Sequence, residues 1–225
     1  MKDLTLCADD YSQSATINRA ILRLVDLGRV NAVSCLSQSF TWHKDARNLA
    51  SAGAPQVGLH FNLTLPLALP ERKVSWVMAA SMVGKLDPRW VRRAFESQWQ
   101  EFVRHFGRPP DFVDGHQHVH VFPVIRETIV DYLASHHAGC WVRTLNPLPG
   151  LPSGPLKQRV LQRLGKPLED RLREASIPTN SGFAGFRSYR KPHQFREQFR
   201  NWLGNHRENT VIMCHPGLES TGPSD

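Results

Sequence analysis

Three histidines and one aspartate occupy alternate positions in the stretch FVDGHQHVHVFP, residues 112–123. In an extended chain, residues two apart point to the same side. A straight strand would therefore place Asp114, His116, His118 and His120 on one face. Carboxylates and imidazoles bind divalent metal ions and transfer protons, so this pattern indicates metal or acid–base chemistry. Strict alternation is not assured, because a glycine lies between Asp114 and His116.

Polar residues of the same kinds interrupt or follow three other apolar runs. Asp9 and Asp10 follow LTLCA, His60 lies within QVGLHFNLT, and His215 follows NTVIMC. If these runs are parallel strands, their carboxyl ends meet at one rim, where α/β proteins carry their active sites. The sequence therefore predicts that these residues converge with Asp114 and His116 at one rim of the fold.

Short apolar runs alternate with helical patterns along most of the chain. Strands are expected at 4–8, 30–37, 56–64, 111–116, 140–145 and 209–214, and helices at 14–28, 87–107, 123–137 and 191–204. Asp87 and Pro88 form a typical helix start, and Gly28 and Gly107 are typical helix ends. Repeated strand, helix, strand predicts parallel strands with helical crossovers, in an α/β barrel or a doubly wound sheet. Residues 146–178 break this rhythm and predict a helical excursion or lid.

Composition predicts a single domain over residues 1–225. The chain is 40% hydrophobic, with six Trp and eleven Phe, which suffices for one large core. Its four cysteines are far apart and form no C-x-x-C pair, which predicts free thiols in a reducing compartment. A signal peptide and an apolar run of membrane-spanning length are both missing, so we expect a cytoplasmic protein.

The net charge of +8, from 28 Lys and Arg against 20 Asp and Glu, raises the question of a polyanionic partner. The cations are scattered along helices and form no dense block, which disfavours nucleic-acid binding. The Leu- and Arg-rich segment 156–173 has two explanations. It could lie on a membrane surface, or it could be a surface helix with paired charges, because Glu169 and Asp170 lie among its arginines.

Each candidate residue also has a structural explanation. His60 could be a core histidine bonded to a carbonyl, adjacent aspartates often cap helices, and alternate histidines can form the solvated face of an edge strand. Taken together, these explanations are weak, because every group lies at the end of a strand or within an apolar one. Burying several such groups without partners is costly, and a bound metal ion is a common partner.

Four motifs spread from residue 7 to 217 carry a family resemblance. CADDYSQSATINRAILRLVDLGRVNAVS resembles the NADDFG…N.GI…G.VTS opening of the YdjC/ChbG family of carbohydrate deacetylases, which has HpnK relatives in hopanoid biosynthesis. VGLHFNLT is similar to G.H.NLT, VDGHQHVHVFP to DSHHHVH..P, and VIMCHPG to E.MCHPG. The resemblance implies a distorted, TIM-like (β/α) barrel. It also implies hydrolysis of an N-acetyl group on an amino sugar, either a chito-oligosaccharide or an N-acetylglucosaminyl lipid.

Position by position, the resemblance makes Asp10, His60 and His116 metal ligands, Asp9 the general base and His215 the general acid. Amide hydrolysis needs a strong nucleophile, a stabilised oxyanion and a protonated amine. A divalent ion lowers the pKa of its bound water and polarises the carbonyl. Two imidazoles suit zinc, while a carboxylate and waters also admit magnesium.

The resemblance also places His118, His120, Asn62 and Phe183 around the substrate, the last in the loop-like TNSGFAGF. An amino sugar is the expected partner, and the hopanoid relatives imply a lipid-linked one as an alternative. A homodimer is a further expectation. Cys7, Tyr11 and Gly115 replace the usual Asn, Phe and Ser of the family. The chain ends eight residues after Gly217, where family members continue, so a C-terminal helix is expected to be missing after 217.

Two rival functions remain open at this point. A phosphoesterase on a similar barrel would more often use a second metal with bridging carboxylates, yet only Asp9, Asp10 and Asp114 are near the predicted site. A basic nucleic-acid-binding protein would need clustered cations interleaved with exposed aromatics. Neither pattern is evident in the sequence.

Overall fold

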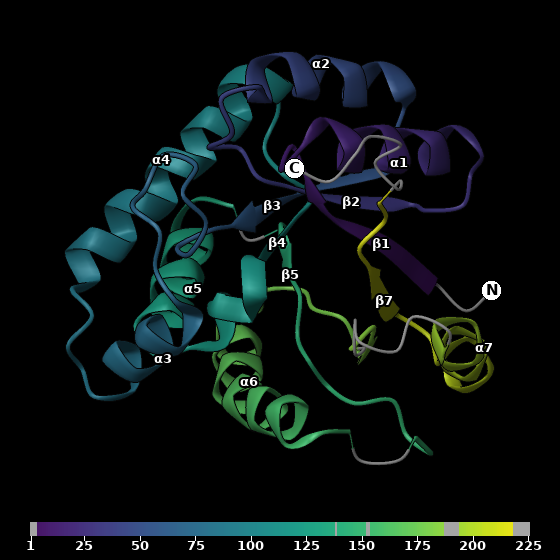
Figure 1. Cartoon of the computed structure of the whole chain (residues 1–225). Helices are drawn as coiled ribbons and strands as arrows, with labels where there is room; N and C mark the ends of the chain where they lie inside the picture. The colour runs from purple at the N-terminus through teal and green to yellow at the C-terminus, as the bar shows by residue number, and fades with distance from the viewer. Residues whose placement is uncertain (1–3, 138, 152–153, 187–193, 218–225) are drawn as a thin grey trace, which may run out of the picture.

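Seven parallel strands form one curled sheet in the computed structural model, which describes residues 4–137, 139–151, 154–186 and 194–217 (Figure 1). The strand order is β5-β4-β3-β2-β1-β7-β6. The strands are β1 (Leu4–Tyr11), β2 (Ala32–Cys35), β3 (Gln56–Phe61), β4 (Phe112–Gly115), β5 (Trp141–Val142), β6 (Gly182–Ala184) and β7 (Thr210–Cys214). Isolated parallel bridges pair Val142 with Thr179 and Pro147 with Phe183, and so link the two outer strands of the sheet. This curled arrangement confirms the distorted barrel.

Helices cover the outside of the sheet (Figure 1). They are α1 (Ala15–Asp26), α2 (Trp42–Ala52), α3 (Val74–Met82), α4 (Pro88–Phe106), α5 (Ile125–His136), α6 (Leu156–Glu174) and α7 (Phe195–Asn205). The boundaries of α4 follow the predicted signals: the Asp87 side chain accepts a hydrogen bond from the Arg89 N–H, and Gly107 ends the helix at φ 86°. Ser14 caps α1 in the same way, through the N–H of Ile17.

The core is continuous through the barrel and its helical layer. Strand residues such as Val33, Leu59 and Val113 are fully buried, and Phe95 and Phe102 of α4 pack on them from outside. Because parallel strands are covered on both faces, they carry unbroken apolar runs rather than alternation. A second, smaller core lies under α7 and consists of Leu148, Ala184, Trp202 and Ile212.

Several elements differ from those expected. Helix α2 and strand β6 were not predicted, α3 forms within an expected loop, and the strand expected at 140–145 is limited to Trp141–Val142. Helix α5 begins at Ile125 rather than at Pro123. Helix α6 fills most of 146–178. The start of the helix expected at 191–204 and any helix after 217 lie outside the described residues.

Candidate metal centre

A bulge at the end of β1 releases two adjacent aspartates from ordinary alternation. Ala8 pairs with Val33 and Tyr11 with Cys35, so three steps along β1 match two along β2. Asp10 has φ 70°, a left-handed conformation that Asp tolerates better than most residues. Asp9 and Asp10 are both buried and reach different partners within the barrel.

A tight turn delivers the three histidines of the 112–123 stretch. Strand β4 ends at Gly115, and residues His116–Val121 form a 3-10 segment in which Gln117 and His118 have φ of 53° and 61°. The one-face arrangement of a straight strand therefore does not occur. A Cβ at Gly115 would lie 2.9 Å from the backbone nitrogen of His120, so glycine permits this close turn.

The three predicted ligands converge in the structure. Asp10 Oδ1 lies 2.9 Å from His116 Nδ1 and 3.3 Å from His60 Nε2. One ligand atom from each of the three buried residues lies within 4.8 Å of the others. His60 Nε2 is buried and makes no well-aligned hydrogen bond. One carboxylate and two imidazoles, with a buried nitrogen of His60 turned toward the other two ligands, fit a zinc or similar divalent ion.

Asp114 orients a ligand rather than joining the set. Its Oδ1 lies 2.6 Å from His60 Nδ1 and accepts a hydrogen bond of 2.6 Å from Ser34 Oγ. A carboxylate behind a metal-ligating histidine fixes the ring and its tautomer. This contact leaves His60 Nε2 to face Asp10 and His116.

Arg143, which sequence reasoning missed, joins two of the aspartates. It is fully buried, forms two hydrogen bonds to Asp9 of 2.6 and 2.8 Å, and lies 2.6 Å from Asp114 Oδ2. A buried carboxylate without a counter-charge is strongly destabilising. The positive charge of Arg143 therefore allows both carboxylates to be buried. The signal was present, because Arg143 is the one charged residue in the strand-like run CWVRTL.

A second group of potential ligands, Cys7, Asp9 and Asp114, lies beside the first. Arg143 already binds both carboxylates of this group. Burial, the largest influence, raises the pKa of the Cys7 thiol well above its ordinary value and keeps it protonated. These three residues therefore belong to an ion-pair network rather than to a second metal site.

The charges around the three ligands shift their pKa values strongly. Burial alone would lower the pKa of His60, but the carboxylates of Asp114, Asp10 and Asp9 outweigh it and raise that pKa to about 10. Burial opposes ionisation of Asp10 as well, yet hydrogen bonds with His116 and His60 hold its pKa well below the usual range. Without a metal ion, a proton on His60 therefore supplies the positive charge that the carboxylates favour.

His215 lies at the rim of this group, with Nε2 3.7 Å from Asp10 Oδ2 and a side chain that is 26% exposed. Burial lowers its pKa, and the nearby carboxylates only partly offset this effect. The structure thus brings His215 together with the three ligands, as the sequence predicts.

The four residues expected around the substrate divide into two pairs. His118 and Phe183 lie together, with ring centroids 5.8 Å apart, and Phe186 lies 5.0 Å from His118. His120 is fully buried, bonds the carbonyl of Arg143 through Nε2, and has a pKa that burial lowers to about 3. Asn62 is also buried.

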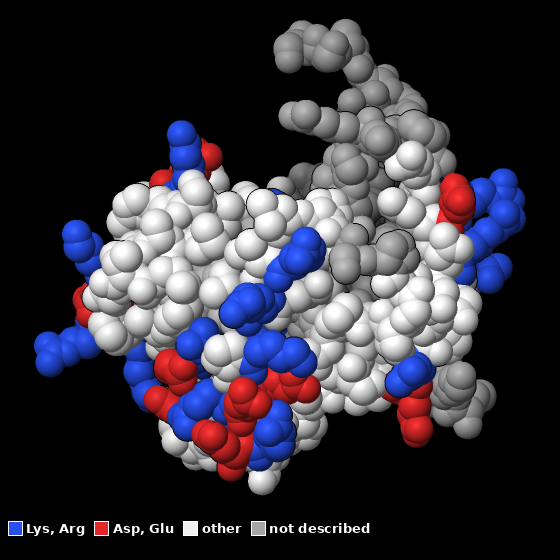
Figure 2. Space-filling model, turned by 90° about the horizontal axis from the view of Figure 1, so that it is seen from below, with Lys and Arg blue, Asp and Glu red and all other residues white. Residues whose placement is uncertain are grey.

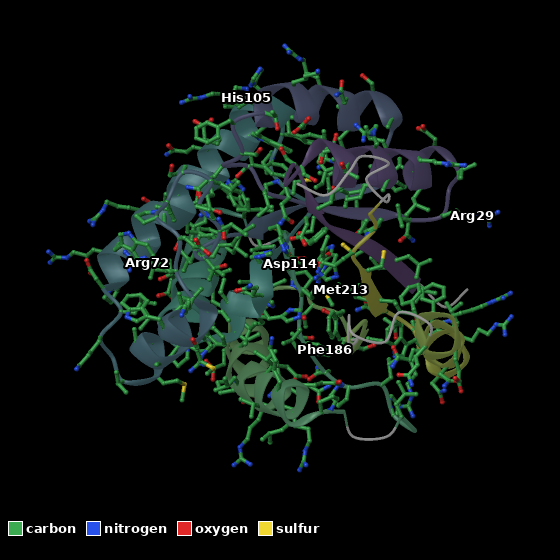
Figure 3. All side chains as sticks on the ribbon, viewed as in Figure 1. Arg29, Arg72, His105, Asp114, Phe186 and Met213 are labelled. Carbon is green, nitrogen blue, oxygen red and sulfur yellow. The ribbon has the colours of Figure 1, made fainter. Side chains whose placement is uncertain are left out.

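Asn62 holds the loop that follows β3, because its Oδ1 accepts hydrogen bonds from the N–H groups of Thr64 and Leu65. Asn62 and His120 therefore build the wall of the site, and their expected substrate contacts stay predictions. In Figure 3, Asp114 lies near the middle of the curled sheet and Phe186 lies toward α6.

The comparison with protein families is decisive for membership. A family described as YdjC-like protein matches residues 3–225. The chain belongs to the YdjC-like family. Among curated proteins, this YdjC-like chain is 30% identical over 141 residues to a chitooligosaccharide deacetylase of Escherichia fergusonii, with 58% of the chain and 55% of the relative covered.

A chitooligosaccharide deacetylase of Yersinia pestis is 32% identical over 133 residues, with 55% of the chain and 53% of the relative covered. The YdjC-like chain thus spans about half the length of the curated relatives it matches. A crystal structure from Enterococcus faecalis V583, titled as a cellobiose-phosphate cleavage protein, has a TM-score of 0.67 at 17% identity. It covers 98% of this chain and 83% of that one, and supports the fold.

Proposed function

We propose that this YdjC-like protein is a metal-dependent hydrolase that removes N-acetyl groups from amino sugars, with chito-oligosaccharides as the main substrate class. The observation that carries the proposal is the convergence of Asp10, His60 and His116, with His60 Nε2 buried and only 3.3 Å from Asp10 Oδ1. The names of the curated relatives support the amino-sugar substrate.

Asp10, His60 and His116 would hold one divalent ion, and zinc fits this set better than magnesium because two of the three ligands are imidazoles. When bound, such an ion lowers the pKa of water and polarises an acetyl carbonyl. Asp114 and Ser34 keep His60 turned toward the other two ligands. The rest of the chemistry falls to this chain's own acids and bases.

Asp9 is proposed as the general base. Both of its oxygens accept hydrogen bonds from Arg143, and each oxygen retains a further lone pair that can take a proton. Its burial excludes bulk water from the same place. The pair with Arg143 fixes its orientation.

His215 is proposed as the general acid that protonates the departing amine. It lies on the carboxyl end of β7, on the open side of the ligand group, and a quarter of its side chain is exposed. Because burial lowers its pKa, the protonated form is a stronger acid than an ordinary imidazolium. The proton must therefore reach it during the reaction cycle.

The distribution of charges on the surface indicates whether the protein could also bind a membrane or a nucleic acid. Figure 2 shows cations interspersed with anions on the face that includes α6. Arg171 pairs with Glu127, Asp131 and Glu174, and Arg173 pairs with Asp170. This pairing favours a surface helix over a basic membrane or nucleic-acid contact. None of the described helices is long and apolar enough to span a bilayer.

A cytoplasmic location remains part of the proposal, supported by four free cysteines. A lipid-linked amino sugar is kept as the second substrate to be tested. A phosphoesterase with two bridged metals is less favoured, because Arg143 already binds the carboxylates of the second acidic group.

Acetate release tests the proposal. Metal-stripped protein would be incubated with N,N′-diacetylchitobiose and with an N-acetylglucosaminyl lipid, before and after zinc or magnesium is added. We expect release from the chitobiose that depends on zinc. Release of phosphate from phosphomonoesters instead, or salt-sensitive DNA retention without acetate release, would support the rival functions.

A further inference from the structure

A turn of residues 10–13 closes the end of β1 and includes the proposed ligand Asp10. The N–H of Gln13 donates a hydrogen bond of 3.1 Å to the carbonyl of Asp10. Asp10 and Ser12 both have left-handed backbones, with φ of 70° and 74°. A residue with a side chain is strained in this conformation, so contacts from elsewhere in the fold must hold the turn.

Two helices supply these contacts. The N–H of Ser12 donates a hydrogen bond of 2.6 Å to Asn18 Oδ1 in α1, and its hydroxyl donates one of 2.6 Å to Asp45 Oδ2 in α2. The hydroxyl of Tyr11 donates one of 2.9 Å to the carbonyl of Asp45. Helices α1 and α2 pack against each other beside β1 and β2 (Figure 1). The turn is therefore held at two consecutive residues, and all four residues that make these contacts are buried.

Asp45 is a buried carboxylate that the proposed chemistry does not use. It is 6% exposed, and no cationic side chain pairs with it among the residues that the structure describes. Its Oδ2 instead accepts hydrogen bonds of 2.6 Å from the hydroxyls of Ser12 and Thr41. Asp45 lies in the first turn of α2, where the helix dipole favours a negative charge. Because hydrogen bonds to an ionised oxygen are strong, the contact with Ser12 is well suited to hold the turn.

The position of the turn determines where the Asp10 carboxylate lies. Asp10 Oδ1 is 2.9 Å from His116 Nδ1 and 3.3 Å from His60 Nε2. A rotation of the backbone at residues 10–12 would move this oxygen relative to both imidazoles. Zinc binds oxygen and nitrogen ligands within about 2.0–2.2 Å, so the centre tolerates little displacement. Groups that orient a ligand from behind change metal affinity without touching the ion.

We propose that Asp45 is a positioning residue of the metal centre, which acts through Ser12 to hold the left-handed turn at Asp10. The turn points the Asp10 carboxylate toward the two imidazole ligands. The inference rests on the proposed function and deepens it, because it assigns control of the ligand geometry to a helix that contacts none of the three ligands.

Two substitutions test the proposal by removing one hydroxyl hydrogen bond each from the same oxygen. Ser12→Ala removes the bond between Asp45 and the turn. Thr41→Ala, the matched control, removes a bond of equal length that lies at the start of α2 and does not involve β1. Each metal-stripped variant is titrated with zinc to give its affinity. The visible spectrum of the Co²⁺ form then reports the coordination geometry.

We expect zinc affinity to fall about tenfold in Ser12→Ala, as for one lost hydrogen bond to a charged group, and the cobalt bands to shift. Thr41→Ala should keep the affinity and the spectrum of the unaltered protein. A purely structural role of Asp45 would lower the stability of both variants and leave zinc affinity and the cobalt spectrum unchanged in the folded protein. That result would overturn the proposal.

Asp45→Asn and Asp45→Ala test the residue itself. Asparagine retains an oxygen that can accept the Ser12 hydroxyl, so zinc affinity should fall less in Asp45→Asn than in Asp45→Ala. Adding Ser12→Ala to Asp45→Ala should cause no further loss, because both remove the same contact. A further tenfold loss in the double variant would show that the two residues act independently, and would contradict the proposal. If Asp45→Ala does not fold, the comparison of Ser12→Ala with Thr41→Ala decides.

The positioning role and the proposed function can fail separately. If the unaltered protein binds zinc but releases no acetate, the deacetylase proposal fails, and zinc affinity and the cobalt spectrum still decide the role of Asp45. If acetate release depends on zinc and Ser12→Ala binds zinc as the unaltered protein does, the positioning role fails and the function stands. A protein that binds neither zinc nor cobalt would overturn both.

Discussion

At the scale of single residues, the centre depends on which of its carboxylates bind an ion and which hold other side chains. Asp10 faces the two histidine ligands, whereas Asp114 lies behind His60 and Asp9 is paired with Arg143. Three aspartates of the same chemistry thus have three roles. The roles follow from partners that are distant in sequence: 54 residues separate Asp114 from His60, 106 separate Asp10 from His116, and 134 separate Asp9 from Arg143.

Asp114→Asn tests the orienting role. An amide is a poorer partner for the His60 ring, so we expect zinc affinity to fall about 10- to 100-fold. Stability should fall as well, because Arg143 loses one buried counter-charge. Zinc titration by calorimetry gives the affinity, and Asp131→Asn on the exposed surface of α5 is the control. An unchanged affinity in folded Asp114→Asn would remove Asp114 from the centre.

Asp9→Asn tests the base. It keeps the size of the side chain and one acceptor for Arg143 but cannot take a proton. We expect kcat for acetate release to fall by about 10²- to 10⁴-fold, with zinc affinity within a few-fold of the original. If activity persists while zinc is bound, Asp9 is not the base, and His215 becomes the candidate.

At the scale of elements, two local irregularities position the ligands: the bulge in β1 and the turn after β4. Residue types and strand ends could be read from the sequence, which correctly brought Asp10, His60, His116 and His215 together. The bulge and the turn could not be predicted from the sequence, because the alternation of side chains with a period of two describes only a regular strand. Arg143 was missed because its partner Asp9 lies 134 residues away in sequence, on a strand that is not adjacent to β5.

Gly115→Ala tests the turn. The added Cβ would lie 2.9 Å from the backbone nitrogen of His120, so the segment 116–121 must shift. We expect a loss of about 1–3 kcal/mol in the free energy of unfolding and weaker zinc binding through His116. Denaturant titration measures the first effect and calorimetry the second.

Gly204→Ala is the matched control for this substitution, because nothing lies within 4 Å of a Cβ at Gly204 near the end of α7. Its stability should be equal or slightly higher. Equal stability and equal zinc affinity of Gly115→Ala and the original protein would show that the turn tolerates a side chain.

At the scale of the whole molecule, the alternation of strands and helices predicted a parallel α/β fold and the family resemblance predicted a distorted barrel, and both are confirmed. The short pairings at its outer strands were not predicted. The outer strand β6 is three residues long, and isolated bridges at Val142 and Pro147 link the β5 side of the sheet to the β6 side. Such short pairings carry little sequence signal. Helices α2 and α3 were missed for a related reason, since short helices with mixed patterns depend on packing more than on propensity.

The pH dependence of stability without metal is a property of the whole fold. The pKa of His60 is about 10 in the folded protein against about 6.5 in the unfolded chain. The stabilisation of the folded state by protonated His60 is therefore complete below pH ~6.5 and is lost as the pH rises toward 10. Stability of the metal-free protein should therefore fall between pH 6.5 and 8.5, by at most about 1.4 kcal/mol per unit. Denaturant titrations across this range measure the slope.

His60→Gln should remove most of this slope. At a saturating concentration of zinc, stability should instead rise with pH, because the ion replaces the proton on His60 more readily as the pH rises. A stability that is independent of pH between 6.5 and 8.5 in the metal-free protein would contradict the charge balance inferred at the centre.

The most direct test of the central claim is a joint titration of metal binding and acetate release. Zinc is added stepwise to metal-stripped protein, and bound zinc and the rate of acetate release from N,N′-diacetylchitobiose are recorded at each step. We predict that activity rises in proportion to bound zinc and levels off at one ion per chain, and that His116→Ala neither binds this ion nor releases acetate. Full activity in the metal-stripped protein, or in His116→Ala, would contradict the account.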